Sequence, residues 1–169
     1  MPTHILQTER LTLREFTLQD AAFIVEIVNT PGWLKYIGDR NIKTIVQAEL
    51  YLQTGPIKSY EKNGYGLWLV ERKADGKTIG MCGIINRETL NHPDIGFAFL
   101  PEDSGQGYAY ESAAATLNYA QNKLKLPTIV AITLPENSRS VKLLQKLGLN
   151  YNYTTTNPET QEELHLYST

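Results

Sequence analysis

A glycine-rich corner between an apolar run and a helix is the part of the sequence best suited to bind an anion. In FLPEDSGQGYAYESAAATLNYAQ, residues 99–121, Gly105 and Gly107 precede an alanine-rich helical stretch. The first N–H groups of a helix have no partner within the helix and carry a partial positive charge. Glycines also allow positive φ and a close approach to a ligand. The corner can therefore hold a phosphate on its main chain, and a sharp turn without a ligand is the other interpretation.

Two better-known phosphate loops do not fit this corner. The dinucleotide fingerprint requires a third glycine where the chain has Tyr110, and it belongs to the opening unit of a parallel sheet. The Walker A loop requires Gly-Lys-Ser/Thr, which does not follow here. Neither an NAD-type oxidoreductase nor a P-loop NTPase is therefore favoured.

Few other side chains suggest catalysis by a metal or a nucleophile. His4, His92 and His165 are scattered, and they form no ligand pair and no arrangement with a nucleophile. Cys82 is the only cysteine, so it cannot form an intramolecular disulfide or belong to a cysteine-rich metal site. It lies in an apolar run, where a thiol is usually a small buried side chain. No metal is expected.

The composition is that of an ordinary globular protein. The 169 residues include 41% hydrophobic and 20% charged side chains, which suits a single domain over residues 1–169. The formal net charge of −2 disfavours nucleic-acid binding, because such proteins present a basic face. No apolar run approaches the roughly 20 residues of a membrane span, and the polar N-terminus is unlike a signal peptide. We therefore expect a cytoplasmic protein that binds neither nucleic acid nor membrane.

The sequence pattern predicts an α+β (mixed α/β) fold. Thr17 and Thr44 are expected to cap helices, and the Asp75-Gly76 pair predicts a hairpin. Pro31 is expected to stop the first helix and to begin an irregular connector. The predicted elements are strands at 10–16, 64–73, 77–87, 95–101, 128–134, 149–156 and 162–169, and helices from 17 to 29, 44 to 62, 107 to 123 and 136 to 149.

The glycine-rich corner resembles a known cofactor-binding motif. EDSGQGYAYESAAATLNYA is similar to the acetyl-CoA-binding motif of the GNAT acyltransferases, Gln/Arg-x-x-Gly-x-Gly/Ala with its helix. Gly107 and Ala109 match the last two fixed positions, and Gly105-Gln106 fill the variable pair. Ser104 departs from the pattern, because the family usually has Arg or Gln at that position.

Two further segments agree with this resemblance. ENSRSVKLLQKLGL is similar to the family's Asn-x-x-Ser-x-x-Leu-x-Glu-Lys-x-Gly-Phe stretch. LQTERLTLREFTLQDA resembles the Leu-x-Thr-Glu-Arg-Leu-x-Leu-Arg opening of the RimJ/RimL-type branch. The three motifs occur in the family's order and cover nearly the whole chain. The matching residues of the second segment are Asn137, Ser140, Leu143, Lys146 and Gly148.

The resemblance implies both a fold and a reaction. The fold would be a central, mostly antiparallel twisted sheet with a splayed parallel pair, flanked by about four helices. The reaction would transfer an acetyl group from acetyl-CoA to a primary amine, by direct attack in a ternary complex. The acceptor would be a protein N-terminal α-amino group or a small-molecule amine, and the enzyme a monomer or homodimer. The alternative is a non-catalytic acyl-CoA-binding or sensing protein of the same fold.

The resemblance also assigns site residues. Asp94 falls where many RimJ/RimL-type members have Glu, so it is the first candidate for the general base, ahead of Glu88 and Glu111. Asp94 would also contact the acceptor, together with Trp33 and Tyr36, although aromatic residues at such spacing commonly belong to the core. The residues expected to bind the cofactor are Ala98, Phe99, Leu100, Ser104, Gly105, Gln106, Gly107, Tyr108, Ala109, Asn137 and Lys146.

The departing thiolate needs a proton donor. Many family members place a Tyr in the second motif, but this chain has Leu144 there. Ser140 could donate instead, and Asn137 could hydrogen-bond the pantetheine arm, so both are assigned catalytic roles. Capping of a helix is the competing explanation for this Asn and Ser pair.

Overall fold

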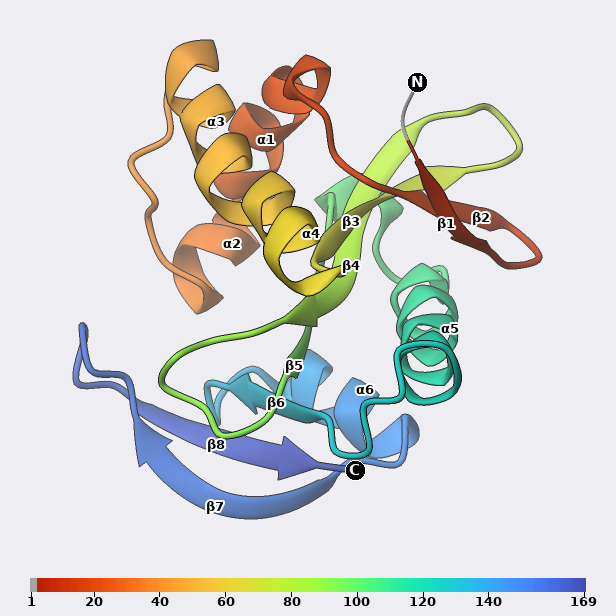
Figure 1. Ribbon diagram of the computed structural model, residues 1–169. Helices are drawn as coiled ribbons and strands as arrows, with labels where there is room; N and C mark the ends of the chain where they lie inside the picture. Colours follow the sequence, from red (N-terminus) through yellow and green to blue (C-terminus); the bar gives the residue numbers. More distant parts are fainter. Residues whose placement is uncertain (1–2) are drawn as a thin grey trace.

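Eight strands form one twisted sheet that runs through the molecule (Figure 1). The computed structural model describes residues 3–169. The strand order is β1-β2-β3-β4-β5-β6-β8-β7, and only β5 and β6 pair in parallel. The predicted mixed fold with one parallel pair is therefore confirmed. The strands are β1 (His4–Gln7), β2 (Leu11–Arg14), β3 (Leu67–Arg72), β4 (Thr78–Ile85), β5 (Asp94–Phe99), β6 (Val130–Thr133), β7 (Asn150–Thr156) and β8 (Glu163–Ser168).

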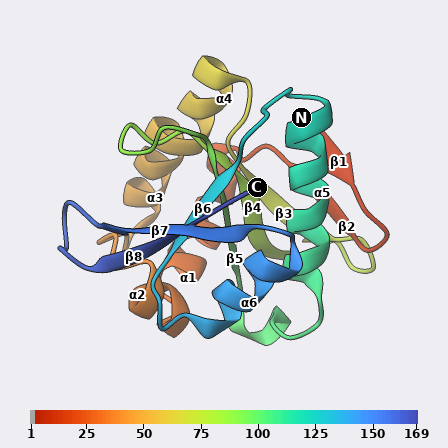
Figure 2. The same ribbon diagram turned by 90° about the horizontal axis from the view of Figure 1, so that it is seen from below.

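Helices cover both faces of this sheet. Figures 1 and 2 show α1 to α4 gathered on one side and α5 on the other, with α6 near β6. Within residues 3–169, none of the helices combines the length and the apolar character that crossing a membrane requires. The helices are α1 (Ala21–Val28), α2 (Pro31–Tyr36), α3 (Ile45–Leu52), α4 (Lys58–Asn63), α5 (Tyr108–Asn122) and α6 (Ser138–Lys146), with shorter helical turns at Leu18–Asp20, Gln53–Ile57 and Pro101–Asp103.

Alternation along β3 and β4 creates a hydrophobic core on each face of the sheet. Trp68 pairs with Cys82, and both are buried in the core that includes residues of α5 and α6. The next pair, Leu69 and Met81, belongs to the core beneath α1, α2 and α3. Because successive side chains of a strand point to opposite faces, one hairpin supplies both cores. Burial raises the pKa of the Cys82 thiol to about 11, so Cys82 is the inert buried side chain that was predicted.

Local capping signals in the sequence are confirmed. The Thr17 hydroxyl caps the helical turn before α1, and Asp20 completes the capping box. Thr44 and Gln47 form the second capping box, at the start of α3. Gly148 adopts φ 92° at the end of α6, which only glycine does without strain. These signals depend on neighbours in the sequence, which is why the sequence displays them.

Three predicted features differ from the structure. The connector predicted after Pro31 is wrong, because Pro31 is the first residue of α2, where a missing N–H and a fixed φ are favourable. The predicted helix at 44–62 is divided into α3, a π-helical turn containing Pro56, and α4. Strand β1 was not predicted, since it is a short edge strand with a register shift between His4 and Leu6.

Candidate active site

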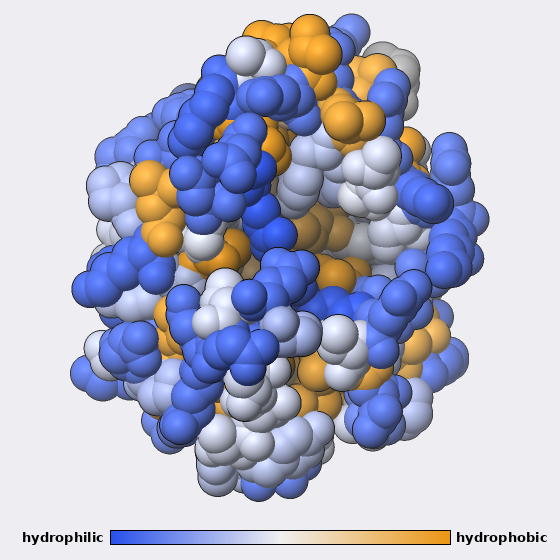
Figure 3. Space-filling model, turned by 90° about the vertical axis from the view of Figure 1, so that its left-hand side faces the viewer, coloured by the Kyte–Doolittle hydropathy of each residue, from blue (hydrophilic) through white to orange (hydrophobic). Residues whose placement is uncertain are grey.

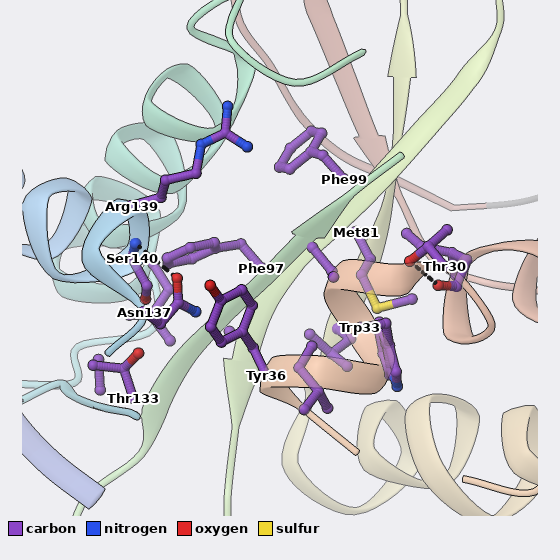
Figure 4. A pocket seen from close by; sticks show the side chains of 18 of the residues that line it. Thr30, Trp33, Tyr36, Met81, Phe97, Phe99, Thr133, Asn137, Arg139 and Ser140 are labelled. Atoms are coloured by element: carbon purple, nitrogen blue, oxygen red, sulfur yellow. Dashed lines mark hydrogen bonds between the residues drawn. The ribbon is translucent and has the colours of Figure 1, made fainter. Parts of the chain in front are cut away.

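A cleft opens where β5 and β6 separate. Their pairing is limited to Asp94 and Val130, so the edge of β5 beyond Asp94 has no strand beside it. The cleft has a volume of about 480 Å³. Figure 4 shows Phe97 and Phe99 of β5 at its base, between α2 on one side and α6 on the other. Figure 3 shows a hollow with apolar atoms at its base in the middle of one face of the molecule.

The glycine-rich corner leads directly into α5. Gly105 and Gly107 adopt φ 77° and 84°, and Gly107 is the N-cap of α5 without any side-chain hydrogen bond to the cap. A Cβ on Gly105 would lie 3.9 Å from the Arg139 guanidinium, and one on Gly107 would lie 3.2 Å from that of Arg10. The free N–H groups and the nearby cations fit a phosphate. The Ser104 hydroxyl donates to the Leu100 carbonyl at 3.2 Å.

The two arginines at the corner differ in their availability. Arg10 donates to Glu111 at 2.8 Å and to the Gln106 carbonyl at 3.0 Å, and its guanidinium lies 4.4 Å from the centre of the Tyr108 ring. Arg139 is exposed and lines the cleft, and it forms no salt bridge with a carboxylate of residues 3–169. Arg139 is therefore the cation at this corner that is free to meet a ligand.

Asp94 is a buried carboxylate at the point where β5 and β6 separate. Its side chain is 2% exposed, and the Arg87 Nε lies 3.2 Å from each of its oxygens. Burial raises the pKa of Asp94 to about 6, and the Arg87 charge and hydrogen bond oppose that rise without cancelling it. A carboxylate with this pKa is mostly ionised at neutral pH and is basic enough to accept a proton.

The start of α6 presents two polar side chains to the same cleft. Asn137 is the N-cap, and its Oδ1 accepts a hydrogen bond from the Ser140 N–H at 3.3 Å (Figure 4). The capping role therefore belongs to the side chain of Asn137 and the backbone of Ser140. The Ser140 hydroxyl makes no hydrogen bond to any other part of residues 3–169, so it is available to a ligand. Tyr36 extends from α2 toward these residues across the cleft.

Comparison with known proteins identifies the family. The family described as "Acetyltransferase (GNAT) domain" matches residues 10–150, which is most of the chain. The chain belongs to the GNAT acetyltransferase family. As a GNAT protein, it is an acyltransferase.

Curated bacterial relatives are similar over most of their length. The uncharacterized N-acetyltransferase YoaA of Bacillus subtilis is 32% identical over 145 residues, covering 85% of this GNAT chain and 81% of YoaA. The uncharacterized protein YkkB of the same organism is 30% identical over 152 residues, covering 88% of this chain and 87% of YkkB.

Solved structures share the GNAT fold. A GNAT-family acetyltransferase from Bacillus anthracis superposes with a TM-score of 0.80 at 24% identity, covering 100% of this chain and 98% of that one. RimL, the ribosomal L7/L12 α-N-protein acetyltransferase, in complex with coenzyme A gives a TM-score of 0.84 at 15% identity, covering 98% and 97%. At these identities the likeness shows a common fold.

The GNAT fold brings most of the predicted site residues to one cleft. Those that line it are Trp33, Tyr36, Asp94, Ala98, Phe99, Ser104, Asn137 and Ser140. The corner residues Gly105, Gln106, Gly107, Tyr108 and Ala109 lie at the entry to α5, and Leu100 is buried in the core beneath α1 to α3. Lys146 lies elsewhere, with its ammonium 4.2 Å from the centre of the Tyr110 ring.

Other residues that could serve this GNAT site were missed or set aside. Arg87 and Thr133 line the cleft but belong to no motif, so nothing in the sequence marked them. Arg139 lies within the second motif, but at one of its variable positions. Glu111, the alternative base, is instead held by Thr8 at 2.6 Å and by Arg10. No group of three or more potential metal ligands occurs within residues 3–169.

Proposed function

We propose that this GNAT protein transfers an acetyl group from acetyl-CoA to a primary amine. The observation that carries the proposal is one cleft lined both by Asp94, the first residue of β5, and by Ser104 of the glycine-rich corner, which follows the end of β5. The corner suits the phosphates of the cofactor, and Asp94 suits the proton that an attacking amine must lose. The whole of residues 1–169 would act as a single cytoplasmic domain, as a monomer or homodimer.

Residues of three elements would hold acetyl-CoA. The pyrophosphate would rest on the N–H groups of residues 105–109, with Arg139 supplying the charge that Ser104 does not. The pantetheine arm would lie along the free edge of β5 at Ala98 and Phe99, because unpaired strand groups bind extended chains. Leu100 would not pair with it, because its N–H already donates to the Ile79 carbonyl and its own carbonyl accepts from Ser104. Asn137 would hydrogen-bond this arm. Lys146 would add positive charge at a greater distance, near Tyr110.

The bound thioester supplies an acyl carbon that an amine nitrogen can attack. The new C–N bond forms as the C–S bond breaks, and the amine loses one proton. Asp94 would accept that proton, directly or through water, and release it to solvent. Ser140 would donate a hydrogen bond to the departing thiolate, which takes up one proton from solvent to become the thiol of coenzyme A. A backbone N–H of β5 would polarise the thioester carbonyl, which is the usual role of an oxyanion hole.

The acceptor would enter on the side of α2. Trp33 and Tyr36 lie on this helix and line the cleft with Asp94. The solved RimL structure is named as an α-N-protein acetyltransferase, which supports a protein N-terminus as acceptor. A small-molecule amine is the second candidate, because the cleft encloses enough space for one.

The experiment that tests this function is thiol release from acetyl-CoA with a panel of amines. Peptides with free N-termini, polyamines and amino sugars would be compared in steady-state assays. We expect turnover with at least one class, and acetyl-CoA should raise the melting temperature whereas NAD should not. Binding of acetyl-CoA without turnover across the panel would instead favour the sensing protein.

Substitution of Arg87 by glutamine is expected to move the pH dependence of kcat toward higher pH. The Arg87 guanidinium lowers the pKa of the buried Asp94, so its removal should raise that pKa above about 6. Asp94 would then stay protonated at neutral pH, and activity would return as the pH is raised. The measurement is kcat against pH, with Arg87→Lys as the charge-conserving control. A uniform loss of rate with an unshifted profile would mean that Arg87 serves only the fold.

A further inference from the structure

A second hollow adjoins the active-site cleft on the side of α4. It has a volume of about 450 Å³ and lies between residues 54–63, residues 84–88 and Arg40. Both cavities are lined by Arg40, Tyr51, Leu67, Ile85 and Arg87. A molecule whose amine reaches Asp94 could therefore extend into the second hollow without leaving the protein surface.

The charged side chains that line the second hollow are mainly positive. Arg40, Lys58, Lys62 and Arg87 line it against one carboxylate, Glu88. This excess runs opposite to the formal net charge of −2 for the whole protein. Charges gathered in a cavity act together, so this hollow should attract anions although the protein as a whole does not.

Three of these cations form no salt bridge within the part of the chain that the structure describes. Arg40, Lys58 and Lys62 are exposed, and none forms a salt bridge with a carboxylate of residues 3–169. Arg87 is already paired with Asp94. The charges of the three free cations are therefore available to a ligand in the hollow.

Tyr51 marks the junction of the two cavities. Burial raises the pKa of its phenol, while the charges of Arg40 and Arg87 oppose the rise, so both guanidiniums lie within electrostatic reach of this hydroxyl. Two of the positive side chains, Arg40 and Arg87, therefore lie at the boundary between the cleft and the second hollow. The positive lining continues along α4, where Lys58 and Lys62 are four residues apart and share one helix face.

We propose that the acceptor is an acidic peptide, whose N-terminal amine lies at Asp94 and whose following Asp or Glu side chains lie in the second hollow. This inference rests on the proposed function. The free cations are spread from Arg40 to Lys62 along a surface hollow, which suits several carboxylates on an extended chain better than one carboxylate of a small amine. The amine itself stays near the buried carboxylate of the Asp94–Arg87 pair.

The test compares peptides that share the N-terminal residue and differ in the next three: Ser-Asp-Glu-Asp, Ser-Ala-Gln-Ala and Ser-Lys-Arg-Lys. We expect kcat/KM for the acidic peptide to exceed that for the neutral one by about tenfold, the scale of a few exposed ion pairs. The preference should reside mainly in KM and weaken as salt is added. Lys58→Gln/Lys62→Gln should remove most of it, and Lys58→Glu/Lys62→Glu should favour the basic peptide.

The control variant is Lys123→Gln, which removes an exposed lysine near the end of α5 that lines neither cavity. It should leave the peptide preference unchanged. Equal kcat/KM for the three peptides, or a preference that survives the Lys58 and Lys62 substitutions, would overturn the inference. Turnover of small carboxylate-bearing amines with rejection of all peptides would overturn it as well.

Failure of the proposed function can be told apart from failure of this inference. If no peptide is acetylated, fluorescence anisotropy of the same labelled peptides in the presence of coenzyme A measures binding alone. Tighter binding of the acidic peptide, lost in Lys58→Gln/Lys62→Gln, would uphold the hollow as an acidic-peptide site without catalysis. Equal binding of the three peptides would overturn it.

Discussion

Replacement of Asp94 by asparagine is expected to lower kcat by about 10²–10⁴-fold, the usual contribution of a general base. Asparagine has nearly the same shape but cannot accept the proton of the amine. Acetyl-CoA affinity should be nearly unchanged, because Asp94 is the first residue of β5 and the phosphate corner follows the end of that strand. The measurements are kcat from initial rates and the acetyl-CoA dissociation constant from calorimetry.

The pH dependence of kcat tests the role of Asp94 more specifically than the rate at one pH does. With a pKa of about 6, Asp94 is protonated and inactive at low pH, so kcat should rise with pH and level off above neutrality. Asp94→Asn should lose this acidic limb. The matched control is Glu88→Gln, which removes the nearby alternative base and should keep the limb. Full activity with an unaltered profile in Asp94→Asn would end the assignment of Asp94 as the base.

The pKa of Asp94 also bears on folding stability. Its folded value of about 6 exceeds the ordinary 3.8, so the native state binds a proton more tightly than the unfolded chain does. The stability from this group is fully present below about pH 4 and is lost as the pH rises toward 6. Burial of the charged form therefore costs stability at neutral pH, a cost that suits a functional carboxylate better than a structural one.

Substitution of Gly107 by valine is expected to weaken acetyl-CoA binding by at least about 100-fold. At φ 84° a β-branched residue is strained, and its Cβ would lie 3.2 Å from the Arg10 guanidinium, where the backbone should face the phosphates. The measurement is the dissociation constant for acetyl-CoA and for coenzyme A, after circular dichroism has shown that the variant is folded.

Gly76 provides a control that distinguishes backbone strain from loss of the phosphate-binding site. Gly76 adopts φ 69° in the β3–β4 hairpin, and no atom lies within 4 Å of the Cβ it would carry. Gly76→Val should therefore show comparable backbone strain with normal acetyl-CoA binding. Unchanged affinity in a folded Gly107→Val would place the phosphates elsewhere.

Local chemistry explains how much of the fold was predictable. The capping boxes at Thr17 and Thr44, the Asp75-Gly76 hairpin and the glycines of the corner each depend on residues within a few positions of one another. The sequence could not show that β5 and β6 separate after a single pair, because pairing between distant strands depends on tertiary packing. The cleft itself was therefore expected only through the family resemblance.

For the candidate site as well, the family resemblance predicted individual residues, but the contacts between them became visible only in the structure. Asp94 was found through the family resemblance, at a position where many RimJ/RimL-type members have Glu, but its ion pair with Arg87 joins a strand to the loop before it and follows from no pattern. Ser140 could equally have been a cap, until the structure showed that the Asn137 side chain caps Ser140 through its backbone N–H. The positive lining from Arg40 to Lys62 depends on where the fold places α4 relative to residues 84–88.

The most direct test of the central claim uses acetyl-CoA with an isotopically labelled acetyl group and a peptide with a free N-terminus. Mass spectrometry of the products would follow the label while a thiol assay counts the coenzyme A released. We predict one labelled acetyl group on the peptide α-amine for each thiol formed, and none retained on the protein. Tight binding of acetyl-CoA with no labelled peptide, or with label held on the protein, would contradict direct transfer in this cleft.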